Sequence, residues 1–132
     1  MSLRKIVVAA LLAAALAGVS GCLSFLSKPS NEPGAVKWGG GKLTKNYAVE
    51  FERTWQAASA TIRDLKLMVN SERGDALVGR IDAQRADGAN VRVDVTRIGE
   101  KLTRVSVRVG FIGSREGAQQ VMDLLDKKLG SP

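Results

Sequence analysis

The sequence predicts an α+β fold, a two-layer sandwich in which two helices pack on one face of an antiparallel sheet of four to five strands. Residues 76–111 contain three stretches of alternating apolar and polar residues, the period of strands with one buried face. Residues 51–65 and 114–130 instead repeat apolar residues every three or four positions, as amphipathic helices do. One apolar sheet face and two apolar helix stripes can cover each other in two layers.

The first helix is expected over "FERTWQAASATIRDL", residues 51–65. Its apolar stripe consists of Phe51, Trp55, Ala58, Ile62 and Leu65, and Trp55 is interpreted as a core residue. A strand-like stretch follows Lys42, "KLMVN" is predicted as a short strand after the helix, and "SERGD" as a turn. The glycine run at residues 39–41 indicates a flexible or closely approached backbone, because no Lys-Ser/Thr pair and helix follow it as a phosphate loop requires.

Three further strands are expected over "ALVGRIDAQ", "NVRVDVTRI" and "LTRVSVRVGF". The Asp87-Gly88 pair favours a hairpin turn between the first two, and Gly99-Glu100-Lys101 connects the last two. The side chains predicted on the face toward the helices are Leu77, Gly79, Ile81, Ala83, Val91, Val93, Val95, Val105, Val107, Val109 and Phe111.

The second helix is expected over "SREGAQQVMDLLDKKLG". Ser114 is a good N-cap, Gly130 suits the position after the last turn, and Lys127 and Lys128 complement the helix dipole. Its apolar stripe consists of Ala118, Val121, Met122, Leu125 and Leu129.

The first 21 residues have the pattern of a secretory signal peptide, with Arg4 and Lys5 before an apolar run and small residues after it. The run of twelve apolar residues is shorter than the roughly 20 that a spanning helix needs. The following "VSGC", residues 19–22, resembles the lipobox of bacterial lipoproteins. That resemblance implies cleavage between Gly21 and Cys22 and acylation of Cys22. The alternatives are an ordinary signal peptide with a chance cysteine, or an unpaired thiol awaiting a partner chain.

Three parts follow from this interpretation: a lipoprotein signal peptide (1–21), the lipidated Cys22 with a flexible tether (22–34), and a single α+β domain (35–132). The tether is rich in Ser, Pro, Asn and Gly, and as a flexible coil it would span on the order of 20 Å. In proteobacterial lipoproteins an aspartate after the cysteine retains the protein in the inner membrane. Leu23 at this position therefore implies the periplasmic face of the outer membrane.

The chain contains one cysteine and no histidine. With the cysteine used for lipid, most zinc, copper and haem sites and all Ser-His or Cys-His nucleophiles are excluded, so we expect no metal, no cofactor and no enzyme. The acid/base candidates are scattered carboxylates such as Asp82 and Asp94, and both are near arginines. A general acid instead needs surroundings without such neighbouring positive charge. The net charge of +7 would suit nucleic acid, but exposed aromatic residues among the basic ones are missing, and we exclude that partner.

The outward face of the predicted sheet carries four arginines, Arg80, Arg92, Arg104 and Arg108. One hypothesis is a guanidinium platform for an anionic partner: lipid A phosphates, a wall polymer or a carboxylate-rich protein surface. The alternative is a solvated face on which arginines pair with Asp82 and Asp94 across strands, each pair contributing about 0.2–1 kcal/mol.

Several short motifs resemble a family of small bacterial lipoproteins catalogued only as a domain of unknown function. They are "Trp55-Gln56-Ala57", "Leu77-Val78-Gly79", "Asp87-Gly88" and "Val107-Arg108-Val109-Gly110-Phe111-Ile112-Gly113". The resemblance covers about residues 36–130, with the lipobox before it. Ser114 replaces the acidic residue common after the last glycine in that family, so no metal role is assigned there. The order of elements is also similar to the helix-grip domains of a lipoprotein in the outer-membrane β-barrel assembly machine.

These observations predict a non-catalytic, outer-membrane-anchored periplasmic lipoprotein that serves as a binding or assembly accessory of the cell envelope. The membrane, through lipidated Cys22, and an envelope protein are the expected partners. The alternative function is an anionic glycan or lipid A binding module that uses the arginine face.

Overall fold

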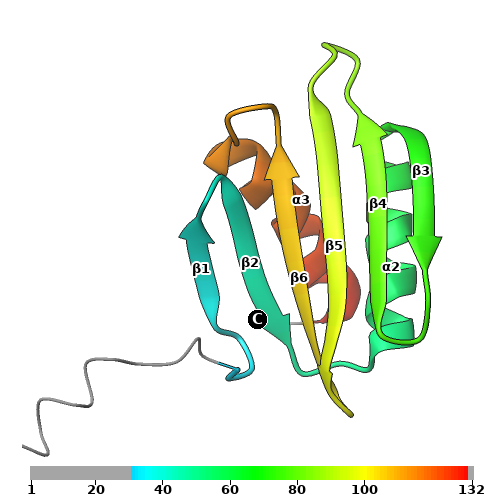
Figure 1. Cartoon of the computed structure of the whole chain (residues 1–132), viewed down its shortest axis with the longest axis vertical. Coiled ribbons are helices and arrows are strands. Elements are labelled where there is room, and N and C mark those ends of the chain that lie inside the picture. The colour runs from blue at the N-terminus through cyan, green and yellow to red at the C-terminus, as the bar shows by residue number, and fades with distance from the viewer. Residues whose placement is uncertain (1–30, 131–132) are drawn as a thin grey trace, which may run out of the picture. The chain divides into compact units, whose positions relative to one another are not determined.

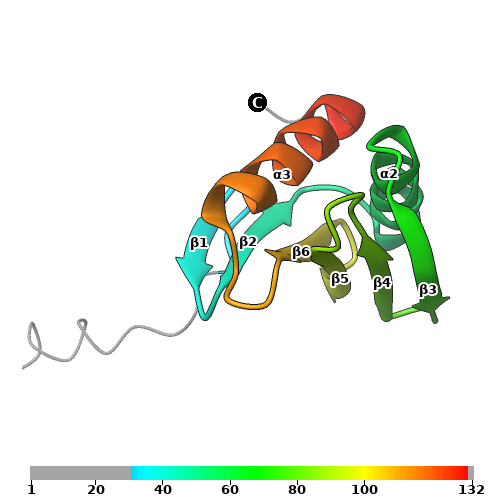
Figure 2. The same ribbon diagram turned by 90° about the horizontal axis from the view of Figure 1, so that it is seen from above.

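The computed structural model describes residues 31–130, which form six strands and two helices. Both helices lie on one face of an antiparallel sheet, as the two views in Figure 1 and Figure 2 show. The predicted α+β class and both helices are confirmed. The strand order is β1-β2-β6-β5-β4-β3. The elements in chain order are β1 (Val36–Gly39), β2 (Lys42–Tyr47), α2 (Phe51–Asp64), β3 (Met68–Gly74), β4 (Val78–Gln84), β5 (Asn90–Gly99), β6 (Leu102–Val109) and α3 (Arg115–Leu129).

The core lies between the helices and the inward face of the central strands. Buried and more exposed residues alternate along β4, β5 and β6, as the sequence pattern predicts. The register sets Val93 opposite Ile81 on β4 and Val107 on β6, so the inward side chains form continuous rows across the sheet. These rows pack against both helices, which also contact each other.

The sheet has six strands, where the sequence predicted four to five. The additional strand is β1, which pairs with β2 through a turn at Gly40 and Gly41, whose φ angles are +60° and +76°. Such angles suit glycine, which has no Cβ to clash with the backbone. The predicted turn at "SERGD" also differs: β3 continues to Gly74 because it pairs with β4 as far as Gly79. A bulge shifts the register of β3 between Val69 and Ser71.

Trp55 is partly buried and packs against the inward face of the sheet, as expected of a core residue. Its indole lies over Gly79 and Gly74, and a Cβ built on Gly79 would lie 2.4 Å from the indole Cζ3 atom. The ring also stacks on Phe51, with the ring centroids 6.4 Å apart and the planes 5° apart. A glycine at an inward sheet position therefore makes room for the largest side chain of α2.

The predicted caps of the second helix are confirmed. The Ser114 hydroxyl accepts a hydrogen bond from the Gly117 amide at 3.1 Å, which satisfies one of the free donors in the first turn. Gly130 ends the helix in the left-handed conformation, with φ +65°.

Two residues predicted on the buried face are exposed instead. Phe111 is 94% exposed, because β6 ends at Val109 and Gly110, with φ +81°, turns the chain out of the strand. Leu77 is 58% exposed, because β4 begins one residue later, at Val78. Both errors come from continuing an alternating pattern past the end of its strand.

Candidate functional site

The four predicted arginines lie on the sheet face opposite the helices, where they alternate with buried residues of β4, β5 and β6. The register pairs Arg80 with Asp94, and Arg92 with both Asp82 on β4 and Arg108 on β6. Arg104 lies opposite Thr96 and Asn46. The structure therefore brings the predicted residues onto one surface but gives them different neighbours. The predicted lipidation site, Gly21 and Cys22, lies outside the described residues.

Arg80 is used in a cross-strand ion pair. Its Nε donates to Asp94 Oδ1 at 2.6 Å, and this hydrogen bond, with the charge of Asp94, raises the pKa of Arg80. The Arg80 side chain is 53% exposed, and exposed pairs of this kind contribute about 0–1 kcal/mol. For this arginine the structure agrees with the alternative of solvated cross-strand pairing.

Arg104 ties the start of the described chain to the sheet. Its Nε donates to Asn46 Oδ1 at 3.0 Å, and its Nη2 donates to Asn31 Oδ1 at 2.8 Å. The Asn46 amide in turn donates to the Glu32 carbonyl at 3.1 Å. Arg104 thus fixes the point at which the expected tether joins the domain.

Arg92 and Arg108 are the arginines best placed to bind an anion. They are direct cross-strand neighbours, and both line a hollow of about 560 Å³ together with Asn70, Asn90 and Asp82. Arg92 Nε donates to Asp82 Oδ1 at 2.8 Å, whereas Arg108 Nη2 donates to the Phe111 carbonyl at 2.6 Å. Two guanidinium groups therefore meet one carboxylate at this hollow, and the site has an excess of positive charge suited to phosphate or carboxylate.

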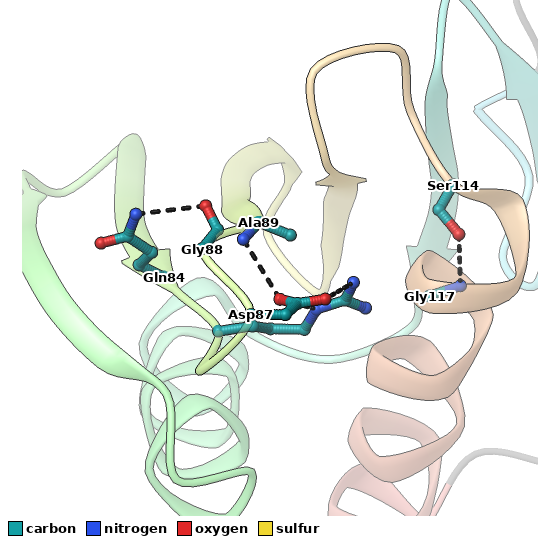
Figure 3. Close-up of polar contacts among 7 residues, drawn as sticks. Gln84, Asp87, Gly88, Ala89, Ser114 and Gly117 are labelled. Carbon is teal, nitrogen blue, oxygen red and sulfur yellow. Dashed lines mark hydrogen bonds and ion pairs between the residues drawn. The ribbon is translucent and has the colours of Figure 1, made fainter.

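A second, apolar hollow of about 450 Å³ lies between the β4–β5 hairpin and the start of α3. Figure 3 shows polar contacts in the hairpin and at the start of α3: Gln84 bonds to the Gly88 carbonyl, the Ala89 amide bonds to Asp87, and Ser114 caps α3. Its volume falls in the range of small-molecule pockets. The apolar and charged lining residues include Leu65, Leu67, Val91, Val121, Lys66 and Arg85. This hollow was not predicted from the sequence, because its lining residues come from elements that are far apart along the chain.

A buried polar cluster beneath α3 was also missed. The Lys45 ammonium lies 2.9 Å from Asp126 Oδ1, and the Tyr47 hydroxyl donates to the same oxygen at 2.5 Å. Burial, reinforced by the hydrogen bond to Asp126, raises the pKa of Tyr47 well above its ordinary value, so the phenol stays protonated and acts as a donor. The available signal was Lys45 itself, a charged residue at an inward position between Leu43 and Tyr47 on β2.

Within residues 31–130, no three His, Cys, Asp or Glu side chains are grouped so that they could hold a metal ion. In the same part of the chain, neither helix is long and apolar enough to cross a membrane.

The sequence matches one family, described as "Protein of unknown function (DUF3568)", over residues 5–128. The matched range takes in Cys22, all six strands and most of α3. No curated protein matches the chain.

Proposed function

The chain belongs to the DUF3568 family of proteins of unknown function, and from that premise we propose that it is a lipid-anchored protein of the bacterial cell envelope whose domain acts by binding rather than by catalysis. Cys22 would carry the lipid, and the domain would stand at the periplasmic face of the outer membrane. A helix-grip-like architecture is part of the proposal, since two helices against one face of an antiparallel sheet are compatible with it.

The observation that carries this proposal is the position of the single cysteine, directly after an apolar leader and small residues. Anchoring by acyl chains is stable when at least two chains insert, because each buried methylene contributes about 0.8 kcal/mol. The test is the intact mass of the chain extracted from membranes. We expect a mature chain that begins at Cys22 and carries fatty acids, and a Cys22→Ala variant that keeps its leader. A native chain that begins at Met1, or that has no acyl mass, would refute the anchor.

Binding rather than catalysis is supported by how the carboxylates on the sheet face are used. Asp82 and Asp94 each accept a hydrogen bond from an arginine across the strand, so both serve in ion pairs. The polar hollow beside them presents guanidinium and amide groups, which recognise anions by hydrogen bonding.

A second candidate function, binding of an anionic glycan or lipid A, is favoured by the pairing of Arg92 with Arg108. The test compares Arg92→Gln with Arg80→Gln, because each change breaks one ion pair with an aspartate but only Arg92 lines the hollow. We expect Arg92→Gln to weaken cosedimentation with lipid A or wall polymer at least tenfold, the value of about one charge-assisted hydrogen bond. Equal binding by both variants and the unchanged protein would eliminate this candidate.

A further inference from the structure

We propose that the domain makes a second contact with an anionic lipid bilayer, through an apolar tip formed by Phe111 and Ile112 and a basic edge formed by Lys37, Lys42 and Arg108. The tip would enter the interfacial region while the basic edge lies against the headgroups. This proposal depends on the proposed lipid anchor in one respect only, the distance between lipidated Cys22 and the tip.

The apolar tip is the most exposed apolar surface in the described part of the chain. Phe111 is 94% exposed and Ile112 is 87% exposed, and they are consecutive residues in the loop between β6 and α3. Figure 1 shows this loop projecting at the end of the sheet where the β1–β2 turn also lies. Single exposed apolar residues are ordinary, but two adjacent ones at a projecting loop form a surface suited to an apolar partner.

The backbone of the loop that carries the tip is held by hydrogen bonds at both of its ends and at Phe111. The Gly110 amide donates to the Asn90 carbonyl at 2.7 Å, and the Ser114 amide donates to the Val109 carbonyl at 2.6 Å. Arg108 Nη2 donates to the Phe111 carbonyl at 2.6 Å. These bonds hold the main chain of the loop in place, so inserting the tip requires little further ordering of the backbone.

The loop also rests on the β1–β2 turn. A Cβ built on Gly113 would lie 2.5 Å from the Gly41 Cα and carbonyl oxygen, so the two turns meet backbone to backbone. This contact joins the apolar tip to the strands that carry Lys37 and Lys42 and makes them one continuous surface.

The charge beside the tip is positive. Residues 33–49 and 101–115, which include β1, β2, β6 and the tip, contain no aspartate or glutamate. Lys37 and Lys42 are exposed and share the outer sheet face with Arg108. Asp82 lines the same hollow as Phe111 and Arg108, but its charge is paired with Arg92. A basic residue near an anionic membrane surface contributes about fivefold in affinity, so this half of the face complements anionic headgroups.

The bilayer is the anionic surface within reach of the tip. Asn31 is bonded to Arg104, which lies six residues before Gly110, so the tip is about 20 Å along the strand from the entry point of the chain. The nine residue steps from Cys22 to Asn31 can span up to about 30 Å. Lipid on Cys22 and the apolar tip can therefore contact one bilayer with the strands lying along its surface. A projecting tip also suits a fluid bilayer, which needs no shaped groove.

The experiment places one spin label at the tip of the lipidated full chain, reconstituted in vesicles of phosphatidylglycerol and phosphatidylcholine. Ile112→Cys provides the label site, because the native thiol is expected to be acylated. Leu77→Cys is the matched control: it is also an exposed apolar residue, but it lies in the β3–β4 turn. The readout is the ratio of collision rates with oxygen and with a water-soluble paramagnetic reagent, which rises with depth in the bilayer.

We expect the ratio at residue 112 to rise several-fold on reconstitution and the ratio at residue 77 to stay at its aqueous value. Lys37→Gln with Lys42→Gln should weaken the tip contact about 25-fold, the product of two fivefold effects, and phosphatidylcholine alone should do the same or more. A label at residue 112 that stays as aqueous as the control overturns the proposal. Immobilisation at residue 112 only in native envelopes, with aqueous access retained, also overturns it in favour of a protein partner.

Flotation of the vesicles separates this proposal from the anchor. A chain that floats while residue 112 stays aqueous has the anchor without the tip contact. If the chain lacks acyl mass, the label is placed in a Cys22→Ser background so that residue 112 has the only thiol; a chain that then still places residue 112 in added anionic vesicles has the tip contact without the anchor.

Discussion

Replacing Gly79 with alanine tests the packing of Trp55 against the sheet. In a strand with ordinary backbone angles, alanine is favoured over glycine by about 0.5–1 kcal/mol. The new Cβ, however, would lie 2.4 and 2.5 Å from the Cζ3 and Cε3 atoms of Trp55, so the indole must move and lose its stack on Phe51. Overpacking of this kind costs about 1–3 kcal/mol, so we expect a net loss of about 1–2 kcal/mol.

The free energy of unfolding is measured by urea denaturation, and Tm should fall by about 5–15 °C in a domain of this size. Gly39→Ala is the matched control, because its Cβ would meet only Lys37 Cε, at 3.8 Å; we expect it to be neutral or slightly stabilising. In a Trp55→Leu background, Gly79→Ala should lose its cost, which isolates the contact as a coupling energy. A Gly79→Ala protein as stable as the unchanged one would refute this account of the sheet–helix contact.

The remaining predictions concern polar contacts. Lys45→Met should lower the free energy of unfolding by about 2–4 kcal/mol, because it leaves Asp126 on the inner side of α3 without its cation; a change below 1 kcal/mol in urea titrations, about the value of an exposed pair, would contradict this. Ser114→Ala should cost about 1 kcal/mol, seen as a lower Tm, since it removes the acceptor for the Gly117 amide; an unchanged Tm would exclude a contribution from the cap. Hydrogen bonds from two backbone amides lower the pKa of Asp75 below its ordinary value of 3.8. The stability that ionised Asp75 adds to the folded state should therefore be present above that pH and be lost as the pH falls further. Asp75→Asn should reduce that pH dependence of the urea midpoint, and an unchanged profile would contradict this assignment.

The alternation of apolar and polar residues within strands made it possible to predict which side chains face the helices and which face outward. Once Val93 and Val107 are assigned to the buried face, Arg92 and Arg108 must face outward, because side chains alternate strictly along a strand. The structure adds the register, which decides that Arg92 lies between Asp82 and Arg108. Register depends on turn geometry and on packing across strands, so the sequence alone could not show that Arg92 and Arg108 line one hollow whereas Arg80 does not.

The errors occur where a strand starts or stops. Phe111 continues the alternating pattern of β6 in the sequence, yet one glycine at position 110 with positive φ sends it into solvent. β1 is only four residues long, ends at Gly39 and is followed by two more glycines, so its sequence shows little strand pattern and the strand depends on its pairing with β2. Lys45 breaks the apolar pattern of β2, and only the position of Asp126 on α3 explains why a lysine is buried there.

The bulge on β3 affects how copies of this domain meet. β3 is an edge strand of seven residues, and a regular edge of that length offers unpaired amides and carbonyls as a template for another chain. Two residues opposing one on β4 interrupt that template near Val69, and the charged side chains of Glu72 and Arg73 follow it. This irregular edge would discourage copies of the domain from joining sheet to sheet into aggregates.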